Sequence, residues 1–272
     1  MRATVWLFTA AIFLAGCASS TRVEPRQVTS LEQIEQSLNE GDLATAMTGL
    51  NDLQAHRSQD LQTLALAARM LTLSEHDSAL LDVIQQILTI DPSNAYGLEQ
   101  MGLLRLSVGN LESAENYLTL ATAMEPLRWM AWNGLGIVAD ANSRFDEAQT
   151  SFKRALEIVP GHPKVLANLG WSRLLDEDYE EAESLLRESL EIAPDSLTTQ
   201  SNLAFCIALQ GRYEQAMILY EDRYDRPVAA NNVGYAAMLR DDLPSARKYL
   251  TMALELQPNY YRKAANNLAG IE

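Results

Sequence analysis

The residues able to do chemistry in this sequence are few and stand far apart. Three histidines and two cysteines are its potential metal ligands or nucleophiles: His56, His76, His162, Cys17 and Cys206. A metal site needs several such side chains at ligand spacing, and none of these has a paired partner. The sequence also has no glycine-rich phosphate loop and no Gly-x-Ser-x-Gly elbow. The sequence therefore predicts a protein that is not an enzyme and has no cofactor, metal or small-molecule substrate. It also predicts that the histidines are solvated and that Cys206 is an inert thiol in the core.

Two other residue types recur at a regular interval and suit a different chemistry. Asparagines stand at four such positions, and an aromatic residue follows three of them by three residues: Asn168, Asn202, Asn232 and Asn266, with Trp171, Phe205 and Tyr235. A carboxamide offers a donor and an acceptor, which matches an extended peptide backbone. Aromatic residues are typical of interfaces, although at helical spacing they also serve as packing. These recurring asparagines and aromatic residues have two possible interpretations. They form a surface that binds a peptide or helix with apolar anchors, or they pack the helices against one another.

The overall charge narrows the possible partners. The chain has a formal charge of -15 and a pI near 4.6. Binding to a phosphate backbone requires clustered Lys and Arg, so nucleic acid is excluded as a partner. Anionic lipid headgroups repel an acidic protein, so any attachment to a membrane must come from something other than a basic patch. The charge favours a protein partner with a basic or neutral surface.

The elements that must position these residues repeat every 34 residues. Segments start at residues 27, 61, 95, 129, 163 and 197, and a seventh starts at 227 because the sixth is four residues short. Three columns carry the repeat: Ile34, Ala68, Gly102, Gly136, Gly170, Ala204 and Gly234; Ala46, Leu80, Ala114, Ala148, Ala182, Ala216 and Ala246; Pro92, Pro126, Pro160, Pro194 and Pro258. A period of this length indicates a stack of supersecondary units.

Each unit reads as a hairpin of two helices, most clearly over residues 129–162. Small residues at Gly136 and Ala148 allow close approach of the two helices, and Phe152 fills the seam at helical spacing. Pro160 ends the second helix. With Trp132 and Leu135, this pattern resembles the tetratricopeptide repeat at nearly every signature position.

The resemblance implies an all-α fold, a right-handed superhelical solenoid of about seven tetratricopeptide helix hairpins over residues 27–272. Residues 27–94 match as degenerate repeats, 95–226 as clear repeats with a shortened sixth, and 227–272 as a last repeat with a capping helix.

In this family the first helix of each hairpin lines a concave groove. The resemblance therefore places the partner-binding groove at Asn133, Asn168, Trp171, Asn202, Phe205, Asn232, Tyr235 and Asn266. The basic residues with which some members hold a terminal carboxylate are not matched, since only Lys164 is basic at the usual sites.

The amino-terminal end has the pattern of an export signal. Arg2 precedes an apolar run that is too short to span a bilayer comfortably. The run ends in Leu14-Ala15-Gly16-Cys17, which resembles the lipobox of bacterial lipoprotein precursors. The resemblance implies a signal peptide over 1–16, lipidation at Cys17 and a lipidated tether over 17–26. An ordinary signal peptide, cut near Ala18, is the alternative.

Taken whole, the chain is similar to the TadD-like lipoproteins of Tad (Flp) pilus assembly, chiefly over residues 227–268. Ala18, where an Asp would resemble an inner-membrane retention signal, favours the outer membrane, periplasmic face. The resemblance implies a scaffold that binds pilus or secretion components such as a secretin. Two alternatives are a pilotin of type IV pili and an adaptor or regulator of peptidoglycan enzymes.

Overall fold

The computed structural model describes residues 30–57, 60–73, 77–257 and 262–271. The predicted signal peptide and tether, with Cys17, lie outside the described residues. Within the described ranges the chain forms fifteen α-helices and no strand: α1 (Leu31–Glu40), α2 (Leu43–Arg57), α3 (Leu61–Leu73), α4 (Asp77–Ile90), α5 (Ala95–Ser107), α6 (Leu111–Met124), α7 (Trp129–Ala141), α8 (Phe145–Ile158), α9 (Pro163–Leu175), α10 (Tyr179–Ile192), α11 (Leu197–Leu209), α12 (Tyr213–Glu221), α13 (Arg226–Leu239), α14 (Leu243–Leu256) and α15 (Arg262–Ala269).

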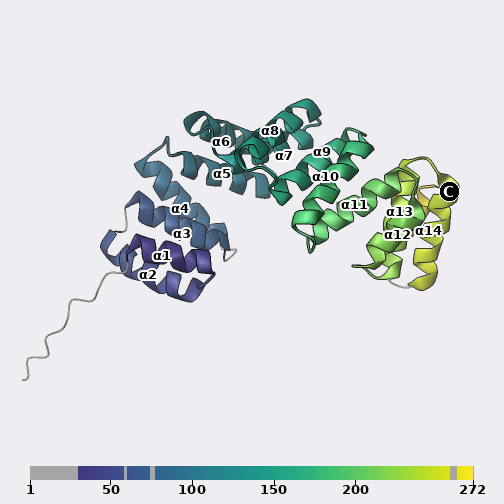
Figure 1. The fold of residues 1–272 in the computed structure, drawn as a ribbon, viewed down its shortest axis with the longest axis horizontal. Helices are drawn as coiled ribbons and strands as arrows, with labels where there is room; N and C mark the ends of the chain where they lie inside the picture. Colours follow the sequence, from purple (N-terminus) through teal and green to yellow (C-terminus); the bar gives the residue numbers. More distant parts are fainter. Residues whose placement is uncertain (1–29, 58–59, 74–76, 258–261, 272) are drawn as a thin grey trace, which may run out of the picture.

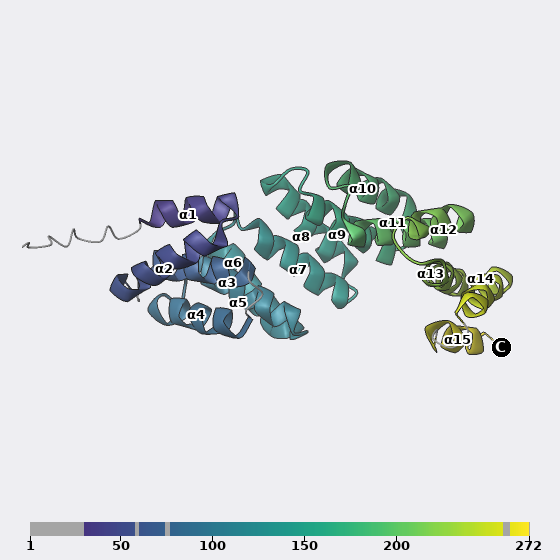
Figure 2. The same cartoon turned by 90° about the horizontal axis from the view of Figure 1, so that it is seen from below.

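The helices form seven successive hairpins followed by the single helix α15. The hairpins follow one another in a curved, extended row, with the two ends of the row far apart (Figures 1 and 2). Each helix contacts the next in sequence. Most odd-numbered helices also contact the odd-numbered helix of the adjacent hairpin, as α7 does with α5 and α9, and α13 does with α11 and α15. From α5 to α15 the odd-numbered helices therefore form one continuous wall, and this wall carries the predicted groove residues.

The 34-residue period of the sequence is confirmed by the helix boundaries. Five first helices begin at residues 61, 95, 129, 163 and 197, where the segments were predicted to start. Helix α1 begins at Leu31, four residues later than the predicted segment start at 27. Ser30 and Gln33 form a reciprocal capping box there, which fixes the start of the helix. The predicted capping helix after the last repeat is α15.

Close approach within the hairpins depends on the small-residue column, as predicted. A Cβ atom placed on Gly136 would lie 2.6 Å from a ring carbon of Phe152, whose side chain is completely buried. No side chain larger than hydrogen fits between α7 and α8 at this point without displacing the ring. The packing of α7 on α8 therefore depends on the absence of a side chain at Gly136.

The turns inside the hairpins add a fourth repeating column, which the sequence analysis missed. One residue in each of the six hairpin turns that the structure describes has a positive φ: Gly41, Gly109, Ser143, Glu177, Gly211 and Asp241. From Gly109 to Gly211 these positions also recur every 34 residues. Glycine adopts this left-handed conformation without steric cost. Glu177, at φ 63°, adopts it with a steric cost from its Cβ atom. The turn geometry is therefore kept even where the residue type is unfavourable.

The predicted shortening of the sixth segment falls on its second helix. Helix α12 has 9 residues, whereas α6, α8, α10 and α14 have 14 each. The chain leaves α12 after Glu221 and enters α13 at Arg226, one residue before the predicted start at Pro227. A proline in the first turn suits this position because it needs no hydrogen-bond donor there. The missing turns bring the residues after α12 close to the odd-numbered wall.

The buried side chains divide into five clusters along the described part of the row. The largest joins helices α9 to α15, from Ala167 to Ala264. Four smaller clusters lie between α1 and α9. None of the helices in the described ranges combines the length and hydropathy needed to cross a bilayer.

Candidate functional site: a groove along helices α9, α11, α13 and α15

Three aromatic side chains form a row along the odd-numbered wall. Trp171 on α9, Phe205 on α11 and Tyr235 on α13 lie side by side, and we call them the aromatic row. The ring centroids of Trp171 and Phe205 are 6.3 Å apart with 26° between the planes, and those of Phe205 and Tyr235 are 6.3 Å apart with 13°. Trp171 and Phe205 are half-buried, while Tyr235 is 39% exposed. The fold thus brings together three residues that lie 34 and 30 positions apart in the sequence.

Asparagine side chains form a parallel row, one helical turn before each ring. Asn168, Asn202 and Asn232 are half-buried on α9, α11 and α13, and Asn266 is exposed on α15. We call these four residues the amide row. Asn133 on α7 differs, because it is only 6% exposed. Its Oδ1 accepts a hydrogen bond of 2.8 Å from Asn168 Nδ2, so it lies beneath the row and orients Asn168.

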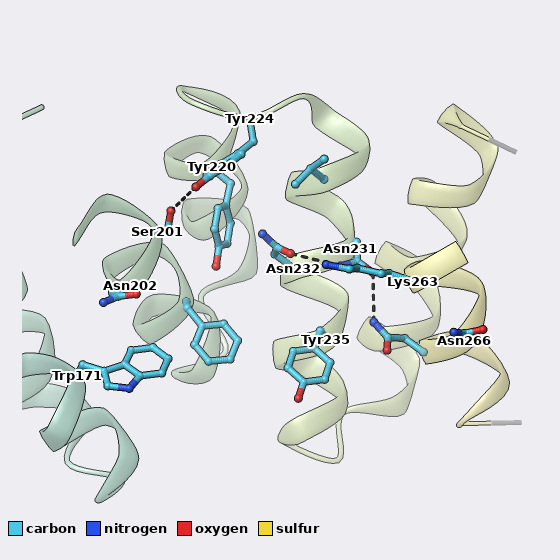
Figure 3. Close-up of a pocket in the computed structure, with 13 residues that line it drawn as sticks. Trp171, Ser201, Asn202, Tyr220, Tyr224, Asn231, Asn232, Tyr235, Lys263 and Asn266 are labelled. Carbon is cyan, nitrogen blue, oxygen red and sulfur yellow. Dashed lines mark hydrogen bonds between the residues drawn. The ribbon is translucent and has the colours of Figure 1, made fainter. Parts of the chain in front are cut away.

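Two further asparagines orient the amide of Asn232. Asn231 is buried, and its Nδ2 donates to Asn232 Oδ1 over 3.3 Å. Its Oδ1 accepts from Asn267 Nδ2 over 3.2 Å (Figure 3). Because the oxygen of Asn232 is engaged by Asn231, its NH2 group remains for a ligand. Asn168, whose NH2 donates to Asn133, instead offers its oxygen.

The aromatic row and three members of the amide row border a hollow of about 640 Å³ at the carboxy-terminal end of the wall, which we call the C-terminal hollow (Figure 3). Its lining includes six of the predicted residues: Trp171, Asn202, Phe205, Asn232, Tyr235 and Asn266. It also includes residues that sequence reasoning missed: Ser201, Tyr220, Tyr224, Val228, Asn231, Lys263 and Asn267. Lys263 is the only charged residue in this lining.

The shortened helix α12 explains two of the missed residues. Tyr220 stands in its last turn and Tyr224 just beyond its end, and both border the hollow. The hydroxyls of Tyr224 and Ser201 are 2.7 Å apart, which joins this turn to α11. Burial raises the pKa of Tyr220, so its hydroxyl stays protonated and can donate. The four-residue shortening was the signal for these contacts, but it did not specify which side chains would turn inward.

A second hollow, of about 710 Å³, lies on the other side of the aromatic row. All three rings border it, together with leucines from the ends of α9, α11 and α13. Leu175 is 37% exposed and Leu239 54% exposed, so this side presents apolar surface. Glu177 and Arg240 are its only charged lining residues. The aromatic row thus borders two hollows, one lined by a mixture of aromatic and polar side chains and one lined by more apolar surface.

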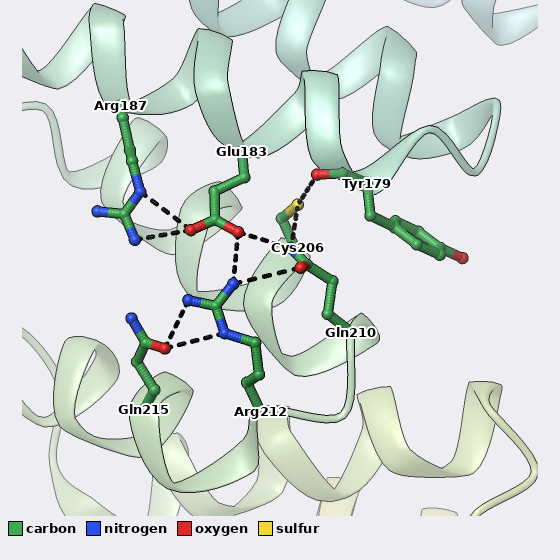
Figure 4. Close-up of polar contacts among 7 residues, drawn as sticks. All are labelled: Tyr179, Glu183, Arg187, Cys206, Gln210, Arg212 and Gln215. Carbon is green, nitrogen blue, oxygen red and sulfur yellow. Dashed lines mark hydrogen bonds and ion pairs between the residues drawn. The ribbon is translucent and has the colours of Figure 1, made fainter.

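A network of charged and polar groups joins α10, the end of α11 and the start of α12 (Figure 4). Glu183 on α10 accepts hydrogen bonds from Arg187, from Gln210 at the end of α11 and from Arg212 at the start of α12. Burial alone would raise the pKa of Glu183, but these hydrogen bonds and the Arg212 charge lower it to about 2. Glu183 therefore stays ionised and ties three helices together behind Phe205.

The predicted inert thiol is confirmed, and the predicted solvated histidine is not. Cys206 is fully buried, its Sγ donates to the carbonyl of Tyr179, and burial raises its pKa to about 11. His162 stacks on Trp129 with ring centroids 4.3 Å apart, and its Nδ1 is buried with no hydrogen-bond partner. Burial and the nearby Lys164 lower its pKa, so it is a packed, neutral ring.

In the described ranges, no group of three or more His, Cys, Asp or Glu side chains is placed to hold a metal ion. Of the remaining histidines, His76 lies outside the described residues.

Comparisons with known proteins identify the fold. Tetratricopeptide repeat family models match residues 129–195 and 173–223. PilF of Pseudomonas aeruginosa is 16% identical with a TM-score of 0.59, over 79% of this chain and 99% of PilF. YrrB, described as a tetratricopeptide repeat protein with an unusual peptide-binding site, is 20% identical with a TM-score of 0.51, over 67% of this chain and 96% of YrrB.

A tetratricopeptide repeat protein from Parabacteroides merdae is also similar, at 16% identity and a TM-score of 0.56, over 89% of this chain and 96% of that protein. A search of curated proteins found no match to the sequence. The fold is therefore an all-α tetratricopeptide repeat solenoid, a class whose members generally act as non-catalytic scaffolds for protein–protein interaction.

Proposed function

We propose that this protein is a scaffold that binds a partner protein through the groove formed by the aromatic row and the amide row. The observation that carries the proposal is the composition of the C-terminal hollow. It combines five aromatic side chains with amide, hydroxyl and ammonium groups that can hold a polypeptide. A rigid wall of packed helices presents them, so little ordering entropy is lost on binding.

The proposal includes a lipid anchor at Cys17 that holds the solenoid at the periplasmic face of the outer membrane. The support is the sequence Leu14-Ala15-Gly16-Cys17 behind an apolar run, with Ala18 after it. Multiple acyl chains bind a bilayer far more strongly than one myristoyl group. The first described helix begins at Leu31, so the folded part would stay near the membrane surface.

The partner we propose belongs to a Tad/Flp-type pilus secretion apparatus, with its secretin as the leading candidate. The support is the similarity of residues 227–268 to the TadD-like lipoproteins, together with the shortened sixth segment. These same residues contribute α13 and α15, which complete the C-terminal hollow.

Two experiments test these statements separately. Cys17→Ala should leave a soluble or inner-membrane precursor, and unchanged fractionation with the outer membrane would contradict the anchor. For the partner, the protein is purified from native membranes and the secretin is quantified by mass spectrometry. Replacing Phe205 and Tyr235 by Ser should greatly reduce secretin recovery.

The matched control for the second experiment is Ile218→Ser, because Ile218 is 69% exposed on α12 and lines neither hollow. It removes a comparable apolar side chain outside the groove and should leave recovery unchanged. Circular dichroism of each variant shows whether the helices remain folded. Equal recovery with folded groove variants and the control would refute a groove-mediated interaction.

A further inference from the structure

The spacing of the aromatic row restricts the conformation of the chain that can lie along it. The two ring-to-ring distances are equal, at 6.3 Å each, and the planes differ by only 26° and 13°. In an extended strand, side chains on one face recur about every 6.6–6.8 Å. Residues i, i+2 and i+4 of such a strand could therefore each meet one ring. In an α-helix, residues four apart are separated by about 6 Å along the axis but are rotated by about 40° at each step, so a third contact turns away from the row.

The amide row gives a second, independent restriction. Asn202 makes no side-chain hydrogen bond to any described residue, although it lies between Asn168 and Asn232 in the row. Asn168 offers an oxygen and Asn232 an NH2 group, so both donors and acceptors are available along the row. An extended peptide has N–H and C=O groups free to meet them. The backbone groups in the interior of a helix are already paired with one another.

The charge of Lys263 indicates which side chain of the bound peptide lies at the α15 end of the groove. Lys263 on α15 is exposed and is the only charged residue bordering the C-terminal hollow, and no carboxylate borders it. It makes no ion pair with any described residue. A carboxylate side chain on the partner, placed at this end of the groove, would find a cation and the NH2 group of Asn232.

On this basis, which rests on the proposed binding function, we propose that the occupant is an extended, strand-like segment of the partner. Apolar residues at three alternate positions contact Trp171, Phe205 and Tyr235, the amide row binds its backbone, and an acidic side chain next to the last apolar residue pairs with Lys263. An amphipathic helix is the occupant that this geometry disfavours.

Two synthetic peptides with the same number of leucines and glutamates test the proposal by fluorescence anisotropy, against the full chain purified from membranes. The first has leucines at positions i, i+2 and i+4 followed by a glutamate, and the second has them at i, i+4 and i+7 in a helix fixed by a side-chain staple. We expect the alternating peptide to bind at least about tenfold more tightly, since it alone can satisfy both rows. Equal or tighter binding by the helical peptide would overturn the proposal.

A third peptide tests the backbone contacts directly. It is the alternating peptide with N-methyl groups on the two residues between the leucines, which removes two N–H donors and keeps the side chains. Loss of one or two backbone hydrogen bonds should weaken binding about tenfold. An unchanged affinity would show that the amide row does not hold a backbone, and the proposal would fail.

Matched lysine variants test the charged end. Lys263→Gln should remove the preference for a glutamate over a glutamine in the alternating peptide, whereas Lys153→Gln, an exposed lysine on α8 outside the hollow, should keep it. A preference that survives in Lys263→Gln would contradict the assigned pairing. Failure of this proposal can be told from failure of the proposed function. If secretin recovery depends on the aromatic row while the peptides show the wrong pattern, only the extended conformation is refuted.

Discussion

Asp140 is a carboxylate whose surroundings should make the stability of the solenoid depend on pH. It stands near the end of α7 and accepts a hydrogen bond of 2.7 Å from Ser172 Oγ on α9. Burial raises its pKa from 3.8 to about 6, against the opposing effect of the Ser172 hydrogen bond, and the nearby Asp176 carboxylate adds to the increase. At pH 7 the folded protein therefore holds an ionised carboxylate in a poorly solvated place.

The sign and size of the effect of Asp140 on stability follow from the difference between its pKa in the folded state and in the unfolded state. Because the folded state binds the proton more tightly than the unfolded state, Asp140 favours folding most below about pH 4, and this contribution is lost as the pH rises through about 6. The interval from 3.8 to about 6 corresponds to about 3 kcal/mol at 1.36 kcal/mol per pKa unit. Solvent screening of a half-buried group reduces this to about 1–2 kcal/mol.

The test is Asp140→Asn, which keeps an oxygen able to accept from Ser172 and cannot ionise. Urea unfolding followed by far-UV circular dichroism from pH 4 to pH 8 gives the difference in unfolding free energy between variant and wild type. We expect a difference near zero at pH 4 that grows to about 1–2 kcal/mol in favour of the variant above pH 7. Asp195→Asn is the control, because the Asp195 side chain is 98% exposed. A difference that does not change with pH, or a variant less stable at pH 8, would refute the reasoning.

Three further substitutions test other parts of the fold by the same unfolding measurement. Gly136→Ala places a methyl group against the buried ring of Phe152 and should destabilise the protein by about 1–3 kcal/mol; no loss would mean that the ring can move aside. Glu177→Gly relieves a positive φ of 63° and should stabilise by about 0.5–1 kcal/mol; a loss would show that the turn gains more from the side chain than its backbone costs. Burial raises the pKa of Glu99 even though it pairs with Arg128 over 3.2 Å, so Glu99→Gln should gain stability relative to wild type as the pH rises from 4 to 8; a variant less stable than wild type at pH 8 would show that the ion pair outweighs the cost of burial.

The sequence predicts the architecture well because its signals are local and repeated. The period of 34 places the starts of five first helices at the observed residues, and the small residue at Gly136 identifies the contact between α7 and α8. The shortening of the sixth segment is visible in the spacing of the columns alone. Repetition supplies several independent readings of one pattern, so a single unusual residue such as Leu80 does not obscure it.

The details of the site were less predictable because they depend on side-chain directions across hairpins. Asn133 and Asn168 belong to nearly the same repeat position, yet the structure buries the first beneath the second. The contact between Asn231 and Asn267 crosses 36 residues and depends on how α15 docks. Tyr220 enters the hollow because a helix ends early, and the sequence shows the deletion without showing where the following side chains turn.

The uneven distribution of the core along the row has a mechanical consequence. The four smaller clusters support the hairpins from α1 to α8, whereas one continuous cluster unites α9 to α15. In a linear stack, each unit is held only by its neighbours, so force applied at the amino end is borne first by the hairpins with the least shared core. Pulling on that end would therefore separate α1 and α2 before it reached the helices that line the C-terminal hollow. The amino-terminal hairpins would then extend under load while the hollow kept its shape.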